Sequence, residues 1–103
     1  MSNTTNIEVA NTILAQLGGN RFLAMTGSKN LVAIENGLTL KLGRGASNGI
    51  THLTVVLRAD DTYDVRFQRV HGVKVTEKGG TEGAYADMLR DVFTSATGFA
   101  TSL

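Results

Sequence analysis

The sequence contains no cysteine, no proline and no tryptophan, and only 6% of its residues are aromatic. Without cysteine the chain cannot form a disulfide scaffold, a zinc ribbon, an iron–sulfur site or a thiol nucleophile. Its apolar runs are all shorter than the roughly 18 residues of a membrane span. Its first residues lack the basic and apolar regions of a signal peptide. We therefore expect a small soluble, cytoplasmic protein without a membrane partner.

The length and composition predict one domain. A chain of 103 residues, 42% of them hydrophobic, is long enough to build a core without disulfides or metal. We find no linker, internal repeat or low-complexity tract, so the predicted domain covers residues 1–103.

Helical periodicity opens the chain. Apolar residues recur at spacings of three and four from Ile7 to Leu17, and the glycines at positions 18 and 19 follow. This pattern predicts a helix over residues 6–17, begun by a capping box of Thr5 and Glu8.

A second helical stripe lies near the C-terminus. Apolar side chains from Tyr85 to Ala96 fall on one face, with charged residues on the other. We expect Thr81 to cap the start of this helix and Gly98 to close it.

Between the helices the period changes to two. Alternating apolar and polar residues predict strands over 38–42, 53–57 and 63–67, with shorter strands at 22–25 and 73–76. The predicted fold is therefore α+β. A single antiparallel sheet of about five strands carries an N-terminal and a C-terminal helix on one face, in the order α-β-β-β-β-β-α.

The alternation also predicts the turns, because residues that face each other across a hairpin lie on the same side of the sheet. A three-residue loop at 59–61 pairs Leu57 with Tyr63, and one at 35–37 pairs Ile34 with Leu38. Beyond residue 67 the inward phase would bury Arg69 and His71. We expect Gly72 to kink the strand there and residues 78–81 to form a loop.

The residues that usually carry catalysis do not form a recognisable pattern. Two histidines, His52 and His71, do not have metal-ligand spacing. The acidic residues Asp60, Asp61 and Asp64 are typical of a turn, although they could hold a divalent ion weakly. The serines lack a nucleophile-elbow motif. We expect no catalytic residues, no metal site, no cofactor and no enzyme activity.

A glycine-rich segment at residues 42–49 leaves two alternatives open. Its three glycines, Arg44 and small polar residues could present backbone amides to a phosphate. Glycine and asparagine also build plain connections between strands.

Charge is unevenly distributed along the chain. Residues 21–58 hold five lysines or arginines against one acid, whereas residues 77–103 hold two against four. By alternation Lys41, Arg58 and Arg66 project from the outer face of the sheet. A basic sheet face suits nucleic-acid phosphate. The candidate nucleic-acid-binding residues are Lys29, Lys41, Arg44, Arg58 and Arg66.

Two observations favour a merely solvated face instead. The isoelectric point is about 8.1, below that of most dedicated nucleic-acid modules. The outer face also lacks aromatic side chains on which single-stranded bases could stack.

Five short segments resemble a group of small uncharacterised proteins of phages, prophages and plasmids. They are residues 18–22 (GGNRF), 25–30 (MTGSKN), 61–67 (DTYDVRF), 82–87 (EGAYAD) and 93–98 (FTSATG). The likeness spans residues 12–103 and departs at Ser28, where alanine is expected, and at Gly43, where proline is expected. It implies an accessory protein of a mobile genetic element, a kind that often binds nucleic acid or inhibits host defence.

We therefore predict a non-catalytic binder of the nucleic-acid backbone. The alternative is a protein–protein inhibitor or adaptor that acts on a host defence complex through its sheet or polar loops. An exposed edge strand would also allow a homodimer to form by extension of the sheet.

Overall fold

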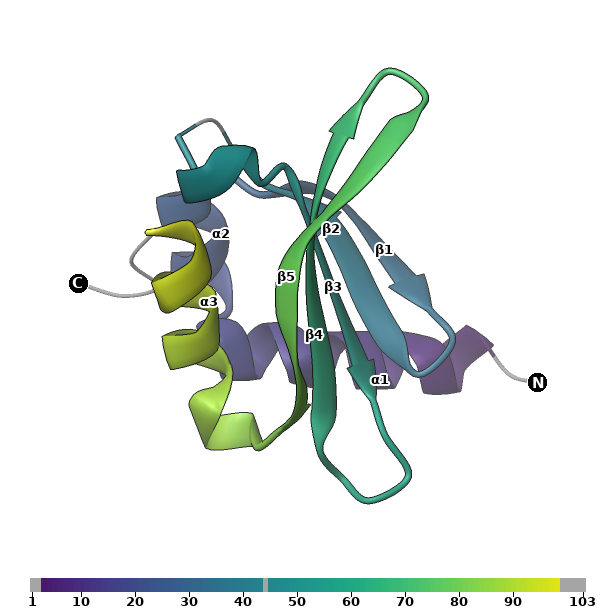
Figure 1. Ribbon diagram of the computed structural model, residues 1–103. Coiled ribbons are helices and arrows are strands. Elements are labelled where there is room, and N and C mark those ends of the chain that lie inside the picture. Colours follow the sequence, from purple (N-terminus) through teal and green to yellow (C-terminus); the bar gives the residue numbers. More distant parts are fainter. Residues whose placement is uncertain (1–2, 44, 99–103) are drawn as a thin grey trace.

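The computed structural model describes residues 3–43 and 45–98 (Figure 1). Five strands form one antiparallel sheet in the order β1-β2-β3-β4-β5, and the helices cover one of its faces. This confirms the predicted α+β class. The elements are α1 (Asn3–Leu17), α2 (Asn20–Thr26), β1 (Lys29–Ile34), β2 (Gly37–Lys41), η1 (Ser47–Gly49), β3 (His52–Leu57), β4 (Tyr63–His71), β5 (Lys74–Ala84), η2 (Ala86–Met88) and α3 (Leu89–Thr97).

The core follows the predicted alternation of β2, β3 and β4. Their inward side chains are almost completely buried beneath the helices, and Leu57 alone among the predicted ones is half-buried. The register pairs Leu57 with Tyr63 and Val55 with Val65, which confirms the loop at 59–61. Asp61, the last loop residue, has φ 67°, a conformation that aspartate tolerates.

The predicted loop at 35–37 is wrong. Ile34 pairs with Gly37, so the hairpin turns through Glu35 and Asn36 alone, and Asn36 takes the positive φ of 56°. The prediction assumed a strand with one buried face, whereas β1 is an edge strand whose residues are nearly all exposed. Gly37 is needed for a different reason, since a Cβ there would lie 2.3 Å from the Val55 carbonyl oxygen.

Residues 22–25, predicted as a strand, lie in helix α2. A short apolar run has no periodicity that separates a strand from a helix. The helix buries Phe22, whose ring meets Phe93 of α3 edge-on with centroids 4.9 Å apart. Tertiary packing between the two helices therefore determines this segment.

The N-terminal helix ends at Leu17 as predicted, but it begins at Asn3. Thr5 thus lies inside the helix, and the predicted capping box is wrong. Ala10, Ile13 and Leu17 are buried on its apolar face. No helix in residues 3–43 or 45–98 is long and apolar enough to cross a membrane.

The C-terminal helix starts later than predicted. Strand β5 continues to Ala84, so Thr81 lies in a strand and cannot cap the helix, and α3 begins only at Leu89. Tyr85, predicted to face the core, precedes the helix and is 63% exposed. Gly98 closes the helix as predicted, with φ 76° and its N–H donated to the Thr94 carbonyl oxygen.

The hairpin of β4 and β5 is much longer than predicted. The kink at Gly72 is instead a two-residue turn, and residues 78–81 belong to β5. Register shifts interrupt β5 at Gly79 and Gly83, both with positive φ. The last pairing of β4 with β3 is that of Gln68 with His52. Beyond it the hairpin extends past the other strands, and we call residues 69–78 the arm (Figure 1).

Candidate nucleic-acid interface

The predicted basic residues are spread over the sheet. Lys29 and Lys41 face each other on β1 and β2, at the end of the sheet from which the arm emerges. Arg66 is exposed on β4, opposite Thr54 of β3 on the uncovered face. Arg44 lies outside the described residues.

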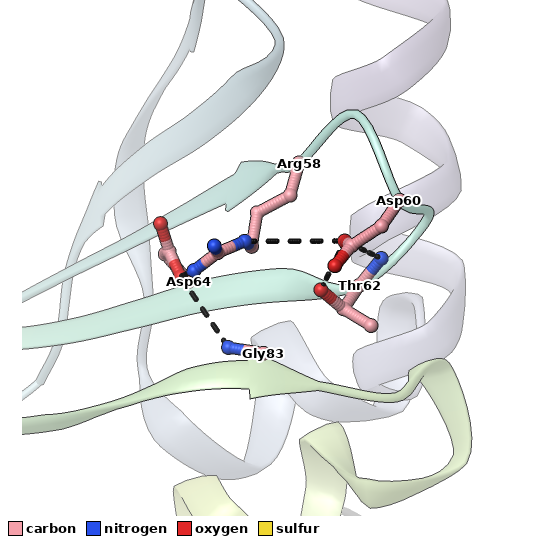
Figure 2. Close-up of polar contacts among 5 residues, drawn as sticks. All are labelled: Arg58, Asp60, Thr62, Asp64 and Gly83. Carbon is pink, nitrogen blue, oxygen red and sulfur yellow. Dashed lines mark hydrogen bonds and ion pairs between the residues drawn. The ribbon is translucent and has the colours of Figure 1, made fainter.

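Arg58 follows β3 at the opposite end of the sheet, where its charge is compensated (Figure 2). Its guanidinium donates to the Asp64 carboxylate at 2.9 Å and lies 3.9 Å from that of Asp60. These two carboxylates raise the pKa of Arg58. Because its charge is already paired, we leave Arg58 out of the interface proposed below.

The acidic residues around Arg58 act within their own turn. Asp60 accepts hydrogen bonds from the Thr62 N–H and hydroxyl, which lower the pKa of its carboxyl. Asp64 also accepts the Gly83 N–H at 3.4 Å. Within the described part of the chain there is no group of three histidine or acidic side chains that could hold a metal ion. The two hydrogen bonds from Thr62 to Asp60 are typical of an aspartate in a turn.

The arm carries a cationic cavity that the sequence analysis missed. The register pairs Arg69 with Thr76 and His71 with Lys74, so these side chains share one side of the ribbon. With Lys78 they line a hollow of about 260 Å³ that contains no carboxylate. Three full positive charges and an imidazole thus converge on one surface, which we call the basic face of the arm.

A second cavity joins the basic face to the glycine-rich loop. Arg69 lines it together with Lys41 and backbone of the loop, including Gly43, Gly45 and Gly49. The Arg69 guanidinium lies over Gly49, where a Cβ would come within 3.0 Å of its nitrogen. The loop that could present amides to a phosphate therefore lies beside two cations.

Charge is separated along the strands. At the arm end the described residues provide five lysines or arginines and one carboxylate, that of Glu77, which accepts a hydrogen bond from Gln68. The other end holds five carboxylates and Arg58, and three of the carboxylates, those of Asp64, Asp60 and Glu82, raise the pKa of Arg58. The members are Lys29, Lys41, Arg69, Lys74 and Lys78 at the arm end, and Glu35, Asp60, Asp61, Asp64 and Glu82 at the other.

The ion pairs within the described residues all belong to Arg58. Among the described residues, the lysines and arginines at the arm end therefore form no ion pair. Such a separation attracts a polyanion to one end of the molecule and repels it from the other.

The opposite side of the arm carries valines beyond the Gln68–Glu77 pair. Val70 pairs with Val75 across the ribbon, and Val75 is 55% exposed. Val73 in the turn is fully exposed. Isolated exposed valines are common, but Val75, half-buried Val70 and Val73 in the adjoining turn form a small hydrophobic surface.

One sequence signal could have located the arm. The inward phase of β4 continues without a break through Arg69 and His71, and Gly72 and Val73 can form a two-residue turn. The sequence analysis did not extend the strand because it assumed that every inward residue of a strand is buried. This assumption is wrong here, because the hairpin runs beyond the helices that cover the sheet.

Comparison with known proteins gives no relative on which the assignment could rest: no family model, no curated protein and no solved structure matches this chain. The resemblance to proteins of phages, prophages and plasmids therefore stays a prediction. The argument for function depends on the chemistry of the chain itself.

Proposed function

We propose that this protein is a non-catalytic binder of nucleic-acid backbone that uses the basic face of its arm. The observation that carries the proposal is the cavity formed by Arg69, His71, Lys74 and Lys78, which lacks any acidic group. Lys41, which lines a cavity with Arg69, and its neighbour Lys29 extend the positive surface onto the sheet. We retain Arg44 and Arg66 from the sequence prediction, with Arg66 on the uncovered face of the sheet.

The shape of the arm supports a duplex as the target. A two-stranded ribbon is narrow enough to enter the major groove of B-form DNA. Lysine and arginine side chains at alternate positions along such a ribbon can contact successive phosphates. The basic face has no phenylalanine, tyrosine or tryptophan for base stacking, so we expect weak preference for sequence and for single strands.

Fluorescence anisotropy with labelled duplex DNA, single-stranded DNA and RNA tests the proposal. We expect affinity to fall steeply between about 50 mM and about 200 mM salt, because binding releases counterions. Changing Arg69, Lys74 and Lys78 together to Gln should weaken binding to every sequence and reduce the slope of log K against log salt by about 3.

The matched control removes the same charge elsewhere. The variant R21Q/R58Q/R90Q also loses three cations, but none of them lines the arm cavity. We expect its affinity to remain within a few-fold of the native protein. Equal losses in both variants would point to net charge alone, and no binding at low salt would overturn the proposal.

The apolar side of the arm favours a second candidate, the protein–protein inhibitor or adaptor of a host defence complex. Here Val73 and Val75 would form the contact. A complex recovered from lysate after nuclease treatment, lost in V73S/V75S and kept in the triple Gln variant, would support this candidate over nucleic-acid binding.

A further inference from the structure

Strand β1 leaves one edge of the sheet open, and this edge is apolar. Val32 is 51% exposed on the uncovered face, and Leu31 is 38% exposed on the side of the helices. Beneath the strand a groove of about 240 Å³ lies between β1 and α1, lined mainly by Ile7, Leu14, Leu31 and Ala33. An unpaired apolar edge strand is a template for pairing with another strand.

We propose that a second copy of this chain covers this edge, with β1 pairing antiparallel to β1 of the partner and the two-fold axis at Val32. The charges of the strand support this occupant. The strand begins at Lys29 and is followed by Glu35. The register shift between Lys29 and Val32 takes up one residue, so an antiparallel copy centred on Val32 sets Lys29 of each chain level with Ile34 of the other and one residue from its Glu35. Two pairs of opposite charges thus flank the apolar centre.

Neighbouring registers are less favourable. A two-fold axis normal to the sheet requires one residue to face its own copy, because alternate residues point to opposite sides. Moving the axis to Ala33 places Leu31 opposite Glu35, and moving it to Leu31 centres the pairing on the irregular part of the strand. The register centred on Val32 instead sets Leu31 against Ala33, and both of these residues line the groove.

The backbone limits how far the pairing extends. The ladder with β2 shifts register between Lys29 and Val32, and Asn30 there has φ 56°. The part that pairs regularly with β2 is therefore residues 32–34. The shift leaves Lys29 on the same side of the sheet as Val32.

The dimer is independent of the proposed nucleic-acid function. Strand β1 and the arm-bearing β5 lie at opposite edges of the five-stranded sheet. Dimerisation through β1 therefore leaves both arms free, and either proposal can fail without the other.

The absence of cysteine makes the register directly testable. In the variant V32C, each chain has one thiol, and the two thiols would face each other across the axis. Opposed residues in antiparallel strands have Cα atoms about 4.5–5.5 Å apart, within the range that a disulfide bridges. Mild oxidation should give a covalent dimer on non-reducing gels. The control V75C, at an equally exposed valine of the arm, should remain largely monomeric.

Charge variants test the same contact in solution. Light scattering of the native protein over about a hundred-fold concentration range should show a monomer–dimer equilibrium. Both V32K and V32E should be monomeric, because like charges then meet at the axis, while circular dichroism reports that they fold. An equimolar mixture of the two should regain the dimer. A native protein that is monomeric throughout, a dimer unaffected by V32K, or equal cross-linking of V32C and V75C would overturn the proposal.

Discussion

The two halves of strand β4 share one alternation of side chains, but the first half is covered by the helices and the second is not. Tyr63, Val65 and Phe67 point inward and are buried beneath the helices, whereas Arg69 and His71 continue the same phase and are exposed. The two halves differ in what covers them. Within the described structure, the helices that cover the sheet do not extend over the ribbon beyond Gln68. The first half stabilises the fold, and the second leaves its charged side chains exposed.

A pair of alanine substitutions, one in each half of β4, tests this difference with the largest expected effect. Phe67 is almost completely buried, and its ring lies 6.5 Å from that of Phe93 between centroids. Phe67→Ala should reduce the free energy of unfolding by about 3–5 kcal/mol, because it removes apolar contacts and leaves a cavity. His71→Ala, four residues along the same side of the strand, should change it by less than about 0.5 kcal/mol. Urea denaturation measures both, and comparable losses would show that the arm packs against the body.

The same comparison explains how far the sequence could predict the fold. Strict alternation with large apolar side chains predicted β2, β3 and most of β4, and it placed the loop at 59–61 correctly. It failed where packing does not distinguish two sides, as in the edge strand β1, and where an apolar run is short, as in α2. It also failed at β5, where Gly79 and Gly80 suggested a loop although both residues lie in the strand that pairs with β4.

The candidate site was less predictable because it depends on which charges find partners. By alternation Arg58 and Arg66 are equivalent, yet Arg58 pairs with Asp64 and Arg66 does not pair with a described acid. The Arg69 guanidinium lies over Gly49 of the glycine-rich loop, which is twenty residues away in the sequence. Contacts of this kind come from tertiary structure, and periodicity alone does not contain them.

The ion pair at the opposite end of the sheet gives a smaller, salt-dependent effect. Asp64→Asn should lower the free energy of unfolding by less than about 1 kcal/mol, because the Arg58–Asp64 pair is partly exposed and screened by solvent. The loss should shrink as salt rises. Asp61→Asn is the matched control, since Asp61 has no ion pair with a described residue and asparagine tolerates its positive φ. Equal, salt-independent losses would mean that Arg58 is not held by this pair.

The smallest expected effect on stability comes from His52, at the point where the arm leaves the sheet. His52 pairs with Gln68 across the strands, and its Nδ1 lies 2.8 Å from the hydroxyl oxygen of Thr51, which accepts the Val70 N–H. Partial burial lowers the pKa of His52 below 6.5, and the nearby charge of Lys41 lowers it further.

The unfolded chain therefore binds this proton at a higher pH than the folded chain does. The contribution of His52 to the free energy of unfolding is therefore fully present above pH 6.5. It is lost as the pH falls from 6.5 toward the lower pKa of the folded state. Thermal unfolding between about pH 5 and pH 7 should show this decline in the native protein and a smaller one in His52→Gln. Lys41→Gln should reduce the decline less, because burial is the larger cause. If the native protein and His52→Gln lose stability in parallel, carboxyl groups rather than this histidine set the pH dependence at the base of the arm.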